Sequence, residues 1–239
     1  QVTDDSGFSG LNPELNCRSK RKDKLNLIQM MKDKGYAVVC TKTELNRLDQ
    51  QTDKMLGLFA GSEMNATIDR DDENTGEPSI PLMTSRAIDF LSRPDQAFFL
   101  MVECGRIDWE SHANDAGAMV KAVDEMDQTL EVCYNLYSKN PTQTLIIFTA
   151  DHETGGPAFS YYSADSIQFS QNLPAGNQWA TSVRSVPFEN YLKLFNQKMS
   201  VAKIFAQAQS AENLRKLVND NMPFTISPNE ARRIYRALK

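Results

Sequence analysis

The chain has 239 residues and a formal net charge of −5. This length allows one large domain or two smaller ones with ample core. The net acidity argues against a nucleic-acid-binding protein, whose binding face would be basic. The apolar runs are strand-sized and shorter than the roughly 18 residues of a membrane-spanning helix, so we expect no membrane span.

The sequence begins at Gln1 with neither an initiator methionine nor a signal-peptide pattern, so we expect it to start inside a longer gene product. Its four cysteines form no C-x-x-C pair and no zinc-finger spacing. Cys40 ends an apolar run and Cys133 lies within a helical pattern, which favours small buried thiols. A disulfide stays possible, so the cysteines do not fix the compartment.

The first hundred residues alternate expected helices with expected strands. In chain order, these are a helix with apolar positions from Leu25 to Met31 that Gly35 closes, a strand at Ala37–Cys40, a helix from Thr41 to about Gln50, a strand at Met55–Phe59 and a helix from Pro81 to Ser92. Thr41 and Glu44 form a capping box, which predicts the start of the second helix. Residues 60–78 are acidic and turn-rich and lack the spaced oxygen ligands of a calcium loop, so we expect a solvated loop.

Two later apolar runs, residues 98–102 and 145–148, have the continuous apolar character of strands buried on both faces. Residues 112–139 between them place apolar side chains at helical spacing, which indicates a helix packed on the core. Alternation of this kind predicts an α/β fold with a mostly parallel central sheet between layers of helices.

After Gly156 the pattern loosens into a mixed segment, residues 157–186, typical of an irregular loop that could include a hairpin. From residue 188 onward the chain is helical in character, with a second capping box at Ser227–Glu230. We therefore predict an α/β core over residues 1–156 and a loop with a helical insertion over residues 157–239.

Each of the two apolar runs is followed by a carboxylate residue and then, within ten positions of that residue, by a histidine. Glu103 and Asp151 end the expected strands, and ligands of open α/β sheets bind outside the carboxyl ends of strands. Asp108 and His112 would share one face of a helix that begins near Asp108. His152 directly follows Asp151, so these two can serve one ion only where the backbone is not a regular strand. Oxygen and imidazole donors suit zinc, and an all-oxygen site around Glu103 would favour magnesium.

A less specific interpretation applies to each cluster taken alone. A strand-end aspartate can cap a helix, and a lone histidine is often an ordinary surface or core residue. Both histidines of this chain lie beside such carboxylates, which favours metal binding. Two metal ions about 4 Å apart can clamp the attacking and leaving oxygens of a phosphoryl transfer, so the ligand types point to that reaction class.

Two motifs resemble the metal-binding motifs of alkaline phosphatases. The first runs from Phe99 to His112 (FLMVE-x-GRID-x-x-x-H), and the second is Thr149–His152 (TADH). The resemblance spans roughly residues 22–156. It implies phosphomonoester hydrolysis through a serine phosphoenzyme, and a fold with a large central sheet sandwiched by helices. It further implies a homodimer with a crown-like helical insertion, and export to the periplasm or beyond, as is typical of bacterial members.

By this resemblance, the metal ligands are Glu103 for magnesium, Asp108 and His112 for the first zinc, and Asp151 and His152 for the second zinc. Trp109 falls where the family varies near the bound phosphate, so the resemblance implies a role in substrate binding.

Two parts of the family pattern are missing from these 239 residues. The nucleophilic serine belongs to an Asp-Ser-Ala motif, and Asp5-Ser6-Gly7 is no substitute because it stands in a polar segment. The last zinc-ligand histidine is missing too, since the sequence has only two histidines. We therefore expect an internal fragment that alone hydrolyses no phosphomonoester. The alternatives are a sister metal-dependent phosphomutase or sulfatase, or a non-catalytic phosphatase-like protein.

Overall fold

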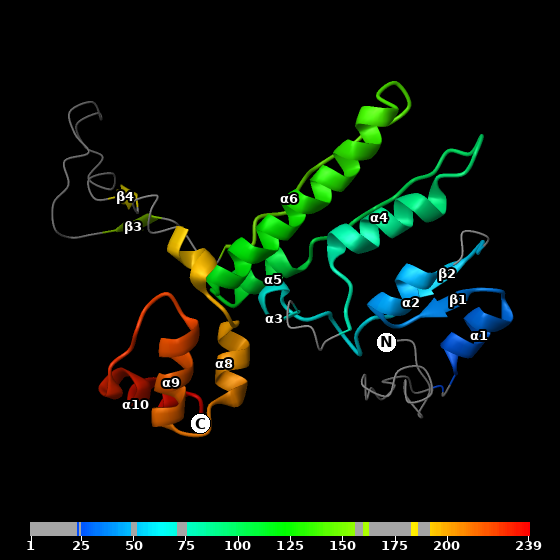
Figure 1. Ribbon diagram of the computed structural model, residues 1–239. Helices are drawn as coiled ribbons and strands as arrows, with labels where there is room; N and C mark the ends of the chain where they lie inside the picture. Colours follow the sequence, from blue (N-terminus) through cyan, green and yellow to red (C-terminus); the bar gives the residue numbers. More distant parts are fainter. Residues whose placement is uncertain are drawn as a thin grey trace, which may run out of the picture. The chain divides into compact units, whose positions relative to one another are not determined.

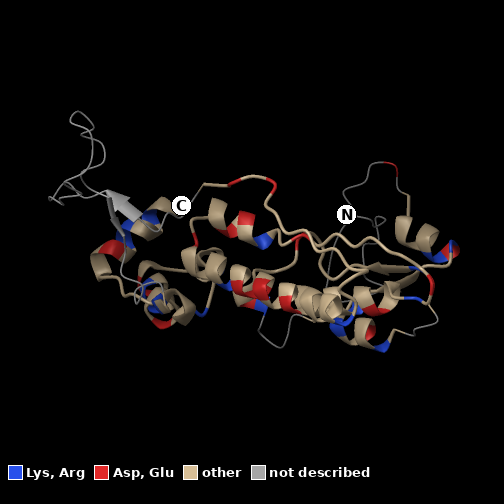
Figure 2. Cartoon of the chain, turned by 90° about the horizontal axis from the view of Figure 1, so that it is seen from above, with Lys and Arg blue, Asp and Glu red and all other residues tan. Residues whose placement is uncertain are grey.

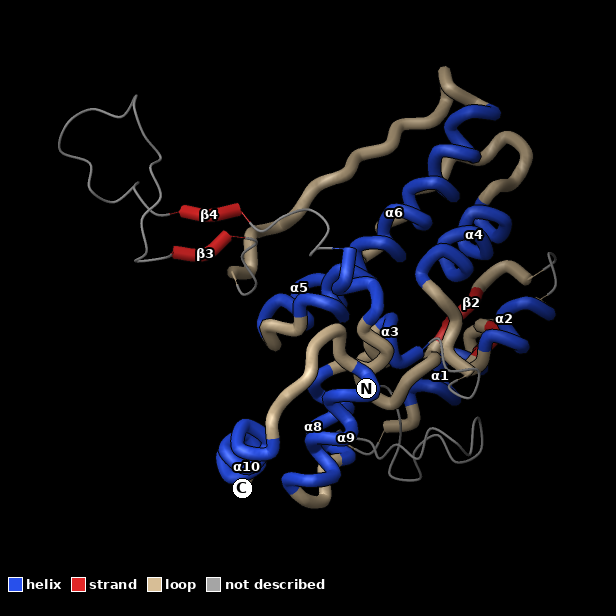
Figure 3. Tube along the Cα trace, turned by 60° about the vertical axis from the view of Figure 1, so that its left-hand side comes forward, coloured by secondary structure: helices blue, strands red, loops and turns tan. Residues whose placement is uncertain are grey.

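The computed structural model describes residues 23, 25–48, 52–70, 76–155, 160–162, 183–185 and 192–239. Helix dominates these residues, and strand is confined to two short pairs (Figure 1, Figure 3). The chain divides into two compact units. The first combines residues 1–104 with 122–149, and the second combines residues 105–121 with 150–239.

The first unit begins with the expected alternation of helix and strand. Its first elements are α1 (Leu27–Asp33), β1 (Ala37–Val39), α2 (Lys42–Arg47) and β2 (Met55–Gly57). The two strands pair in parallel, with Ala37 opposite Met55. Gly35 turns the chain from α1 into β1 at φ +81°, a left-handed conformation that favours glycine. The predicted elements are confirmed here, although α2 ends at Arg47 and not near Gln50.

Local capping explains where these helices begin. Asn26 accepts the Gln29 amide at the start of α1. The predicted capping box of α2 is present: Thr41 accepts the Glu44 amide at 3.1 Å, and Glu44 accepts the Thr41 amide at 3.1 Å.

The buried Cys40 packs against Ile28 of α1. Burial raises the pKa of its thiol to about 11, and the nearby Glu44 carboxylate adds to the rise. Cys40 is therefore the small buried thiol that the sequence predicts.

The acidic stretch at 60–78 is not simply a solvated loop. It contains α3 (Thr67–Arg70), where Thr67, Ile68 and even the Arg70 side chain are buried. Residues 71–75 lie outside the described part of the chain. α4 (Ile80–Leu91) follows, with Ser79 accepting the Leu82 amide as its N-cap. The expectation of solvation is wrong for 66–70 because Arg70 has a buried partner.

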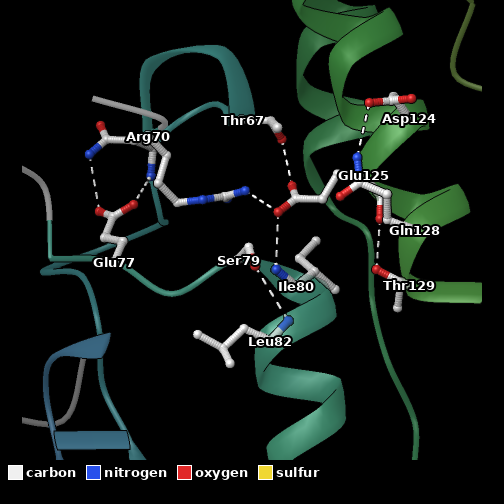
Figure 4. Close-up of polar contacts among 11 residues, drawn as sticks. Thr67, Arg70, Glu77, Ser79, Ile80, Leu82, Asp124, Glu125, Gln128 and Thr129 are labelled. Carbon is white, nitrogen blue, oxygen red and sulfur yellow. Dashed lines mark hydrogen bonds and ion pairs between the residues drawn. The ribbon is translucent and has the colours of Figure 1, made fainter. Parts of the chain in front are cut away.

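That partner is Glu125 on α6 (Ala116–Lys139), which is 4% exposed (Figure 4). Its carboxylate accepts hydrogen bonds from Arg70, from the Thr67 hydroxyl at 2.7 Å and from the Ile80 amide at 3.0 Å. Burial raises the pKa of Glu125, but this effect is outweighed. Hydrogen bonds from Arg70, Thr67 and Ile80, together with the positive charge of Arg70, hold the pKa below its usual range. One carboxylate thus joins α3, the start of α4 and α6.

The buried stripe of α6 is small and polar. Its buried residues include Ala118, Ala122, Glu125 and Thr129. The sequence predicted an apolar stripe on this helix, at Met119, Val120, Val123, Met126, Leu130, Cys133 and Leu136. Those side chains are half-buried, and Val123 is exposed. Glu125 can be buried on this face because its carboxylate accepts three hydrogen bonds.

The apolar runs 98–102 and 145–148 are extended but belong to no strand among the described residues. Phe99 is 87% exposed and Leu145 is 82% exposed, whereas the alternate positions Phe98 and Ile146 are only 38% and 37% exposed. The prediction of strands buried on both faces is therefore wrong for this chain as it stands. A period-2 pattern of exposure shows strand-like segments with one face partly covered and the other bare.

The second unit is mainly helical. It contains α5 (Arg106–His112), the first residues of α6, η3 (Lys193–Asn196), α8 (Val201–Gln207), α9 (Ala211–Asn221) and α10 (Pro228–Ala237). The last three helices lie side by side around buried Ile204, Leu214 and Val218 (Figure 1). The capping box at Ser227 is confirmed, with Glu230 accepting the Ser227 amide at 2.7 Å.

The predicted loop at 157–186 lies largely outside the described residues. Within it, β3 (Ser160–Tyr162) and β4 (Val183–Ser185) pair antiparallel, with Ser160 opposite Ser185. Lysine, arginine, aspartate and glutamate all occur along the described helices (Figure 2). No helix in the described part of the chain combines the length and apolar character that crossing a membrane requires.

Candidate metal centre

Asp108 and His112 lie one turn apart on α5, as their spacing predicts. The Oδ1 atom of Asp108 is 3.6 Å from the Nε2 atom of His112. The helix ends directly after His112, because Asn114 adopts a left-handed φ of +54°. The side chain of His112 is 66% exposed and that of Asp108 is 36% exposed, so both are open to a ligand from solvent.

Asp151 and His152 form a second pair in the same unit. The Nε2 atom of His152 is 3.5 Å from the Oδ2 atom of Asp151, whose Oδ1 atom accepts the His152 amide at 3.0 Å. Adjacent residues can face each other in this way because residues 151–155 are not in a regular strand. Gly155 has a φ of +75°, and its amide donates to Glu153 at 2.8 Å. The turn that the sequence required at this point is therefore present.

Thr154 brings the two pairs together across 46 positions of sequence. Its hydroxyl donates to Asp108 Oδ1 at 2.6 Å. The ring of His152 contacts the Glu153 carbonyl through Nδ1 at 3.0 Å. That contact raises the pKa of His152, and the negative charges of Asp151 and Asp108 raise it further. This corner of the unit is thus electrostatically negative and favours a cation.

The donors fit zinc in type: two imidazoles and two carboxylates, all at least partly exposed. They are arranged as two pairs. Across the described residues, no group of three or more histidine, cysteine, aspartate or glutamate side chains is placed to hold a metal ion by itself. Each pair therefore offers part of a coordination shell, and a tetrahedral zinc site would need further ligands.

Glu103 and Trp109 complete the set of predicted site residues. Glu103 is exposed at the end of the run 98–102 and belongs to the first unit, whereas the four other predicted ligands belong to the second. Trp109 follows Asp108 on α5 and is 49% exposed. The guanidinium of Arg106 lies 5.3 Å from the Trp109 ring centroid, a cation–π distance.

Sequence reasoning missed Thr154 and Asp115. The sequence shows a threonine hydroxyl two positions after His152. Its hydrogen bond with Asp108 could not be predicted, because the two residues are 46 positions apart. Asp115 precedes α6 and accepts the Ala118 amide at 3.1 Å, which is the pattern of a helix cap. An aspartate directly before a long helical pattern could have been identified as a cap from sequence.

The comparison with known proteins decides the family. The family model described as alkaline phosphatase matches residues 8–226. The chain belongs to the alkaline phosphatase family.

Relatives of this alkaline phosphatase chain include two from Bacillus subtilis strain 168. Alkaline phosphatase 4 is 40% identical over 136 residues, covering 57% of this chain and 28% of the relative. Alkaline phosphatase 3 is 32% identical over 203 residues, covering 82% of this chain and 42% of the relative. The chain therefore spans less than half the length of either relative.

Solved structures support the same assignment. The crystal structure of Thermus thermophilus alkaline phosphatase matches with a TM-score of 0.72 and 28% sequence identity. The match covers 98% of this chain and 44% of that one. The described fold is thus alkaline phosphatase-like, in a helix-rich form with a small parallel sheet.

Proposed function

We propose that this chain carries zinc ligands of an enzyme that hydrolyses phosphate monoesters. The observation that supports this most strongly is the hydrogen bond from Thr154 to Asp108, which brings the Asp108–His112 and Asp151–His152 pairs into one negative corner. Family membership supplies the reaction class. The run Glu103–Asp108 favours a phosphatase over sister phosphomutases and sulfatases.

In this proposal each pair contributes to one zinc site. Asp108 and His112 hold the first zinc, and Asp151 and His152 hold the second. Glu103 holds magnesium, a hard cation that prefers oxygen ligands. When bound, the two zinc ions supply Lewis-acid stabilisation of the charge that develops on the oxygens around phosphorus.

The chain's own side chains orient this chemistry. Thr154 holds the carboxylate of Asp108 in one orientation by donating to its Oδ1 atom. Trp109 extends from the same helix into solvent and would contact the phosphate of the substrate. The attacking serine, which forms the phosphoenzyme, would come from polypeptide outside these 239 residues, since they hold no Asp-Ser-Ala motif.

The remaining parts of the proposal concern the intact enzyme. Residues 1–156 would contribute to an α/β core with a larger central sheet, and residues 157–239 would form a crown-like insertion. The enzyme would act as an exported homodimer. These features follow from the family resemblance.

Zinc titration of the purified chain by calorimetry tests the ligand assignment. The double variant His112→Ala/His152→Ala should lose most zinc binding, because it removes the imidazole of each pair. The matched control Glu131→Ala changes an exposed carboxylate on α6 and should bind zinc as the wild type does. Undiminished binding by the histidine variant would contradict the assignment.

Hydrolysis of nitrophenyl phosphate tests the role of the missing serine. The chain alone should show no turnover, with or without added zinc, because the nucleophile is not among its residues. Turnover by the purified chain that a chelator abolishes would contradict this part of the proposal. Zinc binding without any activity after the rest of a phosphatase is supplied would favour the non-catalytic alternative.

A further inference from the structure

Asp115 is a buried carboxylate at the turn between α5 and α6, and it is 2% exposed. Its Oδ1 atom accepts the Ala118 amide at 3.1 Å and the Gln197 side-chain amide at 2.7 Å. Its Oδ2 atom accepts the Val201 amide at 2.6 Å. We call these four residues the Asp115 cluster, and all of them belong to the second unit.

The Asp115 cluster joins the starts of two helices that are far apart in sequence. Ala118 lies in the first turn of α6, and Val201 is the first residue of α8. A carboxylate stabilises exposed N–H groups at a helix N-terminus, and here one carboxylate serves two such ends. The C-terminal helices are thereby fixed to the α5–α6 turn.

The packing at this point is tight as well as polar. A Cβ atom added to Gly117 would lie 2.0 Å from Gln197 Oε1 and 2.8 Å from Gln197 Cβ. The side chain of Gln197 is 3% exposed and also donates to the Met199 carbonyl at 3.0 Å. Gln197 therefore has one well-defined position against α6, which glycine at 117 makes possible.

The Asp115 cluster begins three residues beyond His112, and the connection between them is short and hydrogen-bonded. The Asn114 amide donates to the Ser111 carbonyl at 3.0 Å, and the Asp115 amide donates to the Glu110 carbonyl at 3.0 Å. The end of α5 is thus attached directly to Asp115.

We propose that Asp115 is a positioning residue for the zinc ligands of α5, through which the C-terminal helices 201–237 fix the direction of Asp108 and His112. The inference rests on the proposed function, since it assigns Asp115 a role toward that metal site. Residues outside the coordination shell that orient metal ligands typically change metal affinity by about 10- to 100-fold when they are lost.

Asp115→Asn is the sharpest variant because it keeps the size and shape of the side chain. An asparagine side chain has one acceptor oxygen and one NH2 donor. Three N–H donors converge on the two oxygens of Asp115, so in the variant at least one donor would face another donor. Gln197→Ala is the milder second variant, which keeps the carboxylate and two of its three donors.

Ser210→Ala is the matched control. Ser210 accepts the Asn213 amide at 3.1 Å as the N-cap of α9, the helix that packs against α8. Its loss weakens the C-terminal helices but leaves the three N–H donors to Asp115 in place. A general loosening of these helices would therefore appear in this control as well.

The experiment measures zinc affinity by calorimetry and hydrogen exchange of residues 106–114 without metal. We expect Asp115→Asn to weaken zinc binding by about 10-fold or more and to speed exchange in α5. Gln197→Ala should act in the same direction to a smaller extent, and Ser210→Ala should resemble the wild type in both measurements. Equal effects of Ser210→Ala and Asp115→Asn would overturn the inference.

The two measurements also separate this inference from the proposed function. A wild-type chain that binds no zinc would refute the proposed metal site. Hydrogen exchange would then still test the role of Asp115. Faster exchange of α5 in Asp115→Asn and Gln197→Ala would support the attachment of α5 to Asp115, and unchanged exchange in both variants would overturn it.

Discussion

Glu125 shows how a single buried charge can organise a unit. Its carboxylate is surrounded by a guanidinium, a hydroxyl and a backbone amide (Figure 4). A buried ion pair is costly to form, but it is costlier to break, because removal of one partner leaves the other charge uncompensated. Substitution of Glu125 should therefore destabilise the first unit.

Glu125→Ala should destabilise the chain by about 3–5 kcal/mol, because Arg70 would lose the carboxylate with which it forms a buried ion pair. Urea unfolding followed by circular dichroism measures this change in the free energy of unfolding. The control Glu131→Ala, at an exposed position of the same helix, should change it by less than about 0.5 kcal/mol. Similar effects of the two variants would show that the Glu125 contacts contribute little.

Glu125 should also make stability depend on acid pH. Since the pKa of Glu125 is lower in the folded chain than its ordinary value of 4.5, the carboxylate stabilises the fold fully above that value. The stabilisation is lost as the pH falls through the lowered folded pKa. Thermal unfolding over a series of acid pH values should show a shallower pH dependence in Glu125→Gln than in the wild type, and equal slopes would contradict this.

Among the helices and strands, the sequence predicts those features that depend on residues close together in the chain, such as helix caps and turns. The caps at Thr41 and Ser227 and the turn at Gly35 were predictable because each acts within a few positions of sequence. The same locality placed Asp108 and His112 on one helix face. Pairs separated by tens of residues, such as Arg70 with Glu125 or Thr154 with Asp108, leave no such pattern.

The burial of extended segments was the least predictable feature. The runs 98–102 and 145–148 are apolar, but their sequence cannot show which polypeptide covers them. In the described residues they are partly covered on one face only. Burial is a property of the whole assembly of elements, whereas apolar character belongs to the segment alone.

Gly117→Ala tests packing between elements. Alanine is the better helix former by up to about 1 kcal/mol, so α6 alone would gain stability. The added Cβ atom would overlap Gln197, including its Cβ atom, and such overpacking typically costs about 1–3 kcal/mol. We therefore expect no gain or a net loss in thermal stability. A clear increase in the melting temperature would show that Gln197 is free to move.

At the scale of the molecule, the bare apolar segments are the main liability. Phe99, Met101, Leu145 and Ile147 are each at least 70% exposed. Contiguous exposed apolar surface of this kind marks an interaction face or promotes aggregation. Segments that join no strand among the described residues add the same tendency, because a sheet edge of another chain can pair with them.

The purified chain should accordingly self-associate or require a partner for solubility. Light scattering over a dilution series measures the mass of the particles. Replacing Phe99 and Ile147 together by serine should shift the distribution toward monomer, whereas the control Glu131→Ala should leave it unchanged. A monodisperse wild-type monomer at all concentrations would contradict the prediction.

We propose the two histidine–carboxylate pairs as the zinc ligands of this chain. X-ray absorption at the zinc edge of the zinc-loaded chain can identify the ligands, because the scattering depends on the ligand atoms. We predict nitrogen and oxygen ligands at about 2.0–2.2 Å with the outer-shell signature of imidazole. Sulfur scattering at about 2.3 Å would place the zinc on cysteines and would rule out the histidine–carboxylate pairs as its ligands.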